Sequence, residues 1–306
     1  MLHYLALWLL VRIGGPLPLG VLDAAARLVG RLAWWASPRL REVTRDHMRH
    51  VLGAGAAAGA IDEAACECVR TAARGYAEFA HLQHLSPDAV RARITSVEGM
   101  DALTAAHAAG RGVIILSAHL GAPEVLSHAA PTFGIDMAGV AEPLHPQRLH
   151  DLVQSMRAVT GVQYFPATLA GLRDARAHLA RGGALGLLVD RDVLHSGRPT
   201  AFFGERAPMP TGAVELARRT GVPIIAVWCY RAPGVGRYRL VARPVPLPPA
   251  TGDREADIAS GMRATIAALE AAIREAPGQW FPLAPVWSGL AADRTPTRRS
   301  VRTRLQ

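Results

Sequence analysis

Residues 112–124 read GVIILSAHLGAPE and place a histidine where a strand ends. The opening run GVIIL is short, apolar and rich in β-branched side chains, which is typical of a buried parallel strand. Open α/β sheets bind ligands at the edge where such strands end, so we expect His119 to lie there. Pro123 suits the first position of a helix, and the helix dipole favours Glu124 in its first turn. This segment therefore predicts a strand, a loop and a helix that bring His119 and Glu124 face to face.

Strands and helices alternate along the chain from about residue 94. The predicted strands are 94–97, 113–116, 137–141, 163–165, 184–189, 224–230 and 238–245. The predicted helices between them are 102–109, 123–130, 147–160, 169–181, 212–220 and 257–275. The alternation predicts a three-layer α/β/α domain around a mostly parallel sheet, with the last strand as a candidate antiparallel edge.

Three regions differ in composition, namely 1–50, 51–290 and 291–306. The first is expected to form amphipathic N-terminal helices, in which Asp23 and the arginines that follow at four-residue spacing make a polar stripe. Terminal tryptophans and trailing arginines suit a membrane interface, and a helix packed on the domain is the alternative. The second region is the main α/β domain, and the third is expected to be a basic, disordered tail.

The composition excludes several classes of site. The 306 residues carry a formal charge of +9, and every basic residue other than histidine is an arginine. Without lysine there is no Schiff-base amine, no pyridoxal-phosphate anchor and no P-loop. Cys66 and Cys68 would point about 200° apart on a helix, which disfavours a metal pair. The arginine excess fits an anionic partner such as nucleic acid, acidic lipid or a phosphorylated cofactor, and a compositional bias explains it equally.

An Asp190-Arg191-Asp192 triplet directly follows the predicted strand 184–189. Carboxylates at the end of a buried strand are costly unless they have partners or a function. A salt-bridged strand end is the structural alternative to a catalytic or binding role.

Two further groups of residues are candidates for binding. Phe203 and Gly204 precede a helix start whose backbone N–H groups could hold an anion, although a plain turn explains the same residues. Glu142 follows the predicted strand 137–141, and Arg157 lies fifteen residues later on a helix. Both could border the same edge as His119, with ordinary surface charge as the alternative.

The motifs together resemble a known family. H-x-G-x-x-E after a strand is similar to the H-x4-D/E motif of lysophospholipid and glycolipid acyltransferases. D-R-D, then F-F-G, P-x-G and the helix AVELARRTGVP resemble the bacterial lipid A late acyltransferase family, which includes the phosphatidylinositol mannoside acyltransferases. The likeness extends to Gln279-Trp280 and Pro285-Val286-Trp287. One departure is that Ala122 and Pro123 stand where the family usually has an aromatic residue before the acid.

The resemblance implies an acyltransferase that moves a fatty acyl chain from an acyl thioester to a glycolipid hydroxyl. The donor would be acyl-CoA or an acylated carrier protein, with no other cofactor. The acceptor would be phosphatidylinositol mannoside first and a lipid A precursor second. His119 would be the general base, with Glu124 orienting its ring and Asp192 as a second candidate for that role. The residues expected to bind substrate are Glu142, Arg157, Asp190, Arg191, Phe203 and Gly204.

The resemblance also implies a location and partners. We expect a peripheral protein on the cytoplasmic face of the plasma membrane, bound to an anionic membrane surface, with no nucleic acid or metal partner. The competing interpretations are a lipid hydrolase that uses Ser117, a metal site at His119, Glu124 and His128, and a non-catalytic membrane-binding protein.

Overall fold

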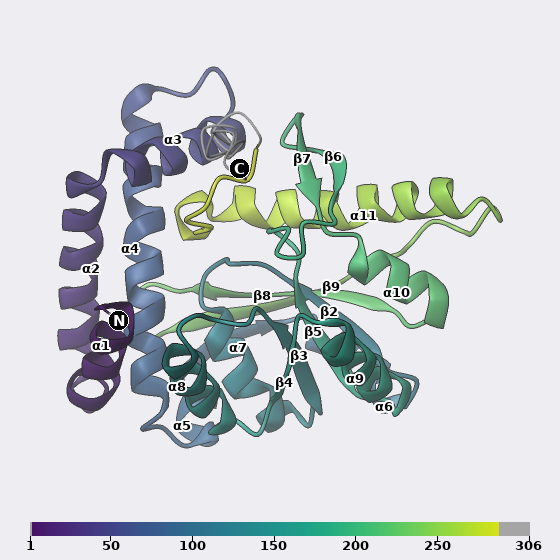
Figure 1. The fold of residues 1–306 in the computed structure, drawn as a ribbon, viewed down its shortest axis with the longest axis horizontal. Coiled ribbons are helices and arrows are strands. Elements are labelled where there is room, and N and C mark those ends of the chain that lie inside the picture. The colour runs from purple at the N-terminus through teal and green to yellow at the C-terminus, as the bar shows by residue number, and fades with distance from the viewer. Residues whose placement is uncertain (1, 288–306) are drawn as a thin grey trace, which may run out of the picture.

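A layer of N-terminal helices precedes a seven-stranded sheet in this protein (Figure 1). The computed structural model describes residues 2–287, so the predicted tail 291–306 lies outside the described residues. The α-helices are α1 (Leu2–Leu9), α2 (Leu19–Ala36), α3 (Pro38–Leu52), α4 (Ala58–Leu82), α5 (Pro87–Arg91), α6 (Met100–Ala108), α7 (Pro123–Ala129), α8 (Gln147–Ala158), α9 (Leu169–Ala180), α10 (Gly212–Thr220) and α11 (Arg254–Glu275). Shorter helical turns are η1 (Leu10–Gly14), η2 (Ala130–Phe133) and η3 (Pro277–Gln279).

The large sheet has the strand order β1-β9-β8-β2-β5-β3-β4. Its strands are β1 (Ile94–Glu98), β2 (Val113–Ser117), β3 (Met137–Ala141), β4 (Gln163–Pro166), β5 (Ala184–Leu188), β8 (Ile224–Arg231) and β9 (Tyr238–Pro244). The five strands from β8 to β4 are parallel, while β9 is antiparallel to β8. The mostly parallel α/β prediction is therefore confirmed.

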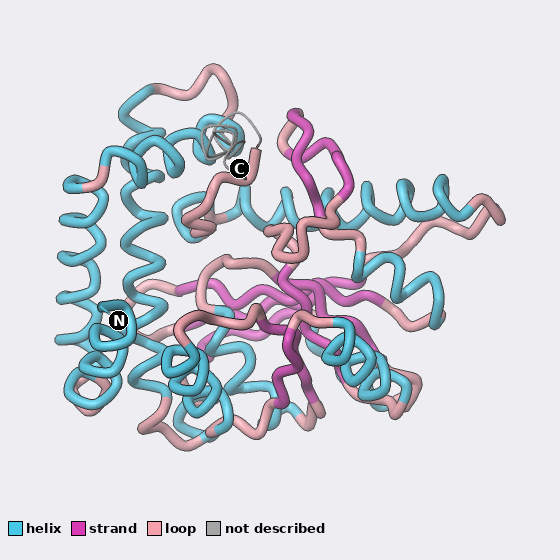
Figure 2. The backbone as a smooth tube through the Cα atoms, in the orientation of Figure 1, coloured by secondary structure: helices cyan, strands magenta, loops and turns pink. Residues whose placement is uncertain are grey.

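Two details of the predicted sheet differ. The strand β9 is antiparallel as expected, but β1 pairs with it in parallel and forms the edge instead. A second sheet, the hairpin of β6 (Arg198–Phe202) and β7 (Glu205–Met209), was not predicted. Pro199 and Pro208 interrupt its strand pattern, which hides the hairpin from a periodicity argument. Figure 2 shows this hairpin rising away from the large sheet beside α11.

The strand β2 lies at the centre of the core, with all five of its residues buried. Ile114 and Leu116 belong to a hydrophobic cluster that includes residues of α9, α10 and α11. Val113 and Ile115 belong to a second cluster that includes residues of α5, α6 and α7. Because alternate side chains of a strand point to opposite faces, helices cover both faces of the sheet. The interior of the domain thus holds the end of β2, and His119 after it, in a fixed place.

Helix α2 carries a charge on its inner side and apolar side chains on its outer side. Asp23 is buried and pairs with Arg27 on α2 and with Arg74 on α4 at 2.7 and 2.6 Å. Five large apolar residues of α2 are 56 to 72% exposed, namely Val21, Leu28, Val29, Leu32 and Trp35. Of the predicted polar stripe, Asp23 faces α4 whereas Arg31 is exposed. The predicted apolar side faces outward except for Leu22, which is buried.

The N-terminal helices share the main core with the sheet. Trp34 of α2 and Met48 of α3 belong to the same hydrophobic cluster as Leu116 of β2. Helices α2 and α4 run side by side next to the sheet (Figure 1). Among residues 2–287, no helix is both long enough and apolar enough to span a bilayer.

His47 of α3 is buried beneath two tryptophans of the C-terminal segment. Its ring centroid lies 5.2 Å from that of Trp280 and 5.7 Å from that of Trp287. Its Nε2 atom has no hydrogen-bond partner in the described structure. Burial, with a smaller effect of His50, lowers the pKa of His47 to about 3, and the charge of Asp190 opposes this only weakly.

We expect His47 to make stability pH-dependent below neutrality. The unfolded chain takes up a proton near the ordinary histidine pKa of about 6.5, while the folded chain does not until about pH 3. The stabilisation from a neutral, buried His47 is therefore fully present above about pH 6.5. As the pH falls from about 6.5 to about 3, the free energy of unfolding drops by up to about 1.4 kcal/mol per pH unit. We expect the free energy of unfolding of His47→Phe, measured in urea at several pH values between 7 and 4, to fall less steeply with falling pH than that of wild type. Identical slopes would contradict this assignment.

Candidate active site

His119 and Asp190 lie opposite each other at the carboxyl edge of the sheet. Strands β2 and β5 are paired in parallel, with Ser117 opposite Leu188. Two residues farther along each chain come His119 and Asp190, so the strand register itself brings them together. The Nδ1 atom of His119 lies 2.9 Å from Oδ1 of Asp190. The sheet edge at which we expected His119 therefore also holds the Asp190 carboxylate that pairs with it.

Asp190 is fully buried, and three N–H groups satisfy its carboxylate. The His119 backbone N–H and the Trp280 indole N–H each donate to Oδ2 at 3.0 Å, and the His119 ring bonds to Oδ1. Burial raises the pKa of Asp190, but the attraction of His119 and these hydrogen bonds together hold it below its ordinary value. The carboxylate is thus ionised at neutral pH and stabilised by its partners.

An ionised Asp190 fixes the tautomer of the His119 ring. A carboxylate only accepts hydrogen bonds, so Nδ1 of His119 carries the proton and donates it to Asp190. The Nε2 atom then has a free lone pair, as a general base requires. The side chain of His119 is 26% exposed, so the ring is not sealed inside the protein.

The predicted orienting residues of His119 have other partners. Glu124 was expected to face the imidazole, but its carboxylate accepts a hydrogen bond from Arg157 at 3.2 Å. Asp192 accepts the backbone N–H groups of Ser196 and Gly197 at 3.1 and 2.8 Å, which turns the chain after β5. The expectation that Glu124 or Asp192 accepts a hydrogen bond from His119 is therefore corrected, because the His119 ring donates to Asp190 instead. Helix α7 does begin at Pro123, as predicted.

The loop after His119 needs a glycine. Gly121 has a φ of +66°, and a Cβ atom added there would lie 2.1 Å from the carbonyl oxygen of Cys229. Its N–H donates to the carbonyl of Gln279 at 2.9 Å, and Ala122 donates to the carbonyl of Cys229 at 2.7 Å. The histidine loop is therefore anchored by β8 on one side and by the chain after α11 on the other.

The remaining predicted binding residues border the same edge or shape it. Arg191 lies 3.9 Å from Glu142, and both are part-exposed. Phe203 and Gly204 form the tight turn of the β6–β7 hairpin with positive φ angles of 49° and 83°. The Phe203 N–H donates to Glu270 at 2.6 Å. A plain turn therefore accounts for Phe203 and Gly204 without an anion.

The Ser117 hydroxyl takes part in a structural hydrogen bond. Its hydroxyl is buried and donates to the carbonyl of Val227 at 2.8 Å. A serine nucleophile must instead contact a base. This geometry counts against the hydrolase interpretation that used Ser117.

Sequence reasoning missed the contribution of the C-terminal segment to the site. Trp280 donates to Asp190, and Phe281 donates its N–H to the His119 carbonyl at 2.9 Å. The Phe281 ring lies edge-on to the imidazole at 6.1 Å. The one sequence signal was the Gln279-Trp280 pair within the family likeness, which by itself gives no role.

Comparison with known proteins gives the family of the chain. Residues 1–288 match the family described as bacterial lipid A biosynthesis acyltransferase. A phosphatidylinositol mannoside acyltransferase of Mycobacterium tuberculosis is 26% identical over 267 residues, which cover 85% of this chain and 80% of that protein. A protein of the same name from Mycolicibacterium smegmatis is 27% identical over 308 residues, covering 98% of this chain and 94% of that protein. The family match spans nearly the whole chain and includes the histidine loop, so the protein is an acyltransferase that belongs to the bacterial lipid A biosynthesis acyltransferase family.

Proposed function

We propose that the protein transfers a fatty acyl chain from an acyl thioester to a hydroxyl group of phosphatidylinositol mannoside. The relatives with that name support the acceptor. The observation that carries the reaction is the part-exposed His119 ring held by the buried, ionised Asp190. Acyl-CoA or an acylated carrier protein would supply the thioester.

The proposed chemistry is a direct transfer with His119 as general base. Its Nε2 atom takes the proton of the acceptor hydroxyl while the oxygen attacks the thioester carbonyl. The C–O bond forms, the C–S bond breaks, and the imidazolium returns its proton to the departing sulfur. Asp190 stabilises the imidazolium through the Nδ1 hydrogen bond. A thioester is already activated, so no acyl-enzyme is needed.

Charged residues near the edge are the proposed contacts for polar parts of the substrates. Glu124 pairs with Arg157 instead of with His119, so we assign it the role of holding this arginine. Arg191 and Glu142 are part-exposed and would face the glycolipid headgroup or the donor phosphates. Asp192 would keep the loop after β5 in shape through its two backbone contacts.

We further propose that the exposed apolar side of α2 binds the membrane, so that the protein is peripheral on the cytoplasmic face. Trp35 at one end of this surface is 72% exposed. An amphipathic helix with its apolar side outward binds lipid when that side enters the headgroup region. The net charge of +9 favours anionic lipid.

The first prediction from this proposed function concerns the base. His119→Ala should lower acyl transfer by about 10²- to 10⁴-fold with thermal unfolding unchanged, because the proton acceptor is lost. The assay combines radiolabelled long-chain acyl-CoA with phosphatidylinositol mannosides and, in parallel, with a lipid A precursor. Labelled mannoside supports the proposal. Labelled free fatty acid alone would indicate a hydrolase, and residual activity of His119→Ala within tenfold of wild type would exclude the base role.

The second prediction separates the two acids of the D-R-D motif. Asp190→Asn keeps the shape of the side chain but removes the charge that stabilises the imidazolium. It should lower kcat by at least 10²-fold with little change in KM. Asp192→Asn, whose contacts are backbone N–H groups, should lower kcat less than tenfold. If Asp192→Asn proves the more damaging variant, the assignment is wrong.

The third prediction concerns membrane binding. The triple variant Val29→Gln, Leu32→Gln and Trp35→Gln should weaken sedimentation with phosphatidylglycerol vesicles by at least tenfold, since each large apolar side chain that leaves water contributes about 1.5–3 kcal/mol when fully buried. Leu169→Gln is the matched control, because Leu169 is 81% exposed but lies on α9. Equal binding of the triple variant and the control would rule out α2 as the membrane contact.

A further inference from the structure

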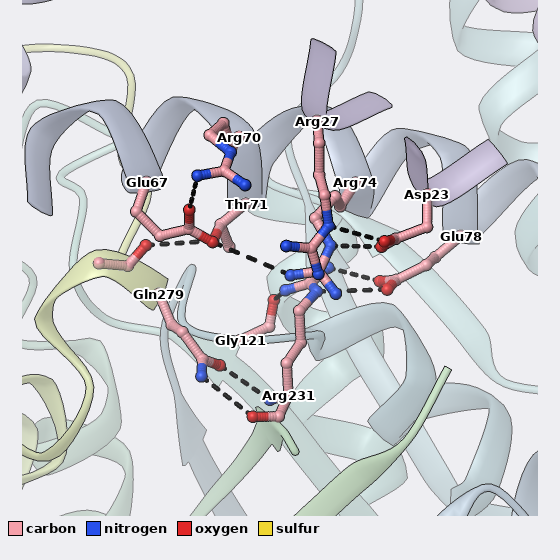
Figure 3. Close-up of polar contacts among 11 residues, drawn as sticks. Asp23, Arg27, Glu67, Arg70, Thr71, Arg74, Glu78, Gly121, Arg231 and Gln279 are labelled. Atoms are coloured by element: carbon pink, nitrogen blue, oxygen red, sulfur yellow. Dashed lines mark hydrogen bonds and ion pairs between the residues drawn. The ribbon is translucent and has the colours of Figure 1, made fainter. Parts of the chain in front are cut away.

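A buried ion pair reaches the histidine loop from the N-terminal helices. The side chains of Arg231, the last residue of β8, and of Glu78 on α4 are 3% and 6% exposed. The Nε atom of Arg231 donates to Glu78 at 3.2 Å, and one terminal nitrogen donates to the second carboxylate oxygen. The other terminal nitrogen donates to the carbonyl of Gly121 (Figure 3). One guanidinium thus joins a helix of the N-terminal layer to the loop that carries His119.

The backbone of Arg231 is fixed as firmly as its side chain. Its N–H donates to Oε1 of Gln279 at 2.8 Å, and the Gln279 amide donates back to the Arg231 carbonyl at 3.1 Å. The Gln279 carbonyl in turn accepts the N–H of Gly121. Arg231, Gln279 and Gly121 therefore form a closed ring of contacts, and Figure 3 shows Arg231 joined to the Gln279 side chain and to Gly121.

The loop needs such a constraint because of its glycine. Gly121 lacks a side chain and adopts a left-handed conformation. A glycine backbone has wide conformational freedom, so local sterics do little to fix the direction of the Gly121 carbonyl. A buried ion pair contributes little to stability compared with apolar packing, because desolvation of both charges offsets their attraction. The planar guanidinium, in contrast, can bind a carboxylate and a carbonyl in fixed directions at the same time.

We propose that Arg231, held by Glu78, is a positioning residue that sets the direction of the His119 ring through the Gly121 carbonyl. The proposal rests on the general-base role of His119. A displacement of about 1 Å in a reacting group can lower a rate by about 100-fold. Loss of the Gly121 contact is therefore expected to appear in kcat, while substrate affinity changes little.

Arg231→Lys tests the proposal. The lysine keeps a positive charge beside Glu78, but one ammonium group cannot reproduce the fork that also holds Gly121. We expect kcat to fall by about 10- to 100-fold with KM within threefold of wild type. In ¹⁵N-histidine-labelled protein, we also expect the His119 Nδ1–H proton resonance to move upfield or broaden, since its hydrogen bond to Asp190 weakens.

Arg74→Lys is the matched control. Arg74 lies on the same helix as Glu78, and its ion pair with Asp23 is similarly buried, with both side chains 7% exposed. It should lower the thermal stability of the protein while leaving kcat and the His119 resonance unchanged. Should Arg231→Lys not fold, Glu78→Gln decides by the same two readouts, because it removes the charge that holds Arg231.

The outcomes separate this inference from the proposed function. Unchanged kcat and an unchanged His119 resonance in Arg231→Lys would overturn the positioning role and leave the base assignment intact. Equal changes in Arg231→Lys and Arg74→Lys would likewise overturn it, since they would show a general loss of stability. Full activity in His119→Ala would instead refute the proposed function, and the resonance would still report whether Arg231 positions the ring.

Discussion

The buried charge of Asp190 is the constraint around which the site is built. A carboxylate withdrawn from water must be matched by donors, and here these come from the end of β2 and from the C-terminal segment. The same three contacts satisfy the charge, orient the histidine and fasten the chain after α11 over the sheet. Stability and the geometry required by the proposed base catalysis therefore depend on one set of hydrogen bonds.

The N-terminal helices depart from the usual arrangement of a surface helix. Asp23 of α2 is buried in an ion pair with Arg74, while Leu32 and Trp35 face outward. Such an arrangement is favourable when something other than water meets the apolar side. Next to this pair on α4, Glu78 continues the polar contacts to Arg231 and the histidine loop (Figure 3). The proposed membrane-binding helix α2 and the histidine loop are thus both held by side chains on neighbouring turns of α4.

Local signals in the sequence were enough for much of the fold. The apolar run of β2 and the proline that begins α7 were both predicted correctly, because each depends on neighbouring residues alone. The partner of His119 was not, because it depends on the register of two strands about 70 residues apart in sequence. The short spacing between His119 and Glu124 favoured Glu124 as the partner of the imidazole. The pairing of β2 with β5 instead places Asp190 beside it. Trp280 and Arg231 contribute from still farther away, and no periodicity reveals such contacts.

The buried position of Asp23 has a consequence for shortening the chain. A protein that began after Ala36 would remove the close carboxylate partner of Arg74, leaving Glu67 at 4.0 Å, and would remove Trp34 from the main core. Breaking a buried pair in this way costs about 3–5 kcal/mol, a large part of the stability of an ordinary domain. The first two helices are therefore structural members of the enzyme, and deleting them to improve handling in detergent-free solution would damage the folded state.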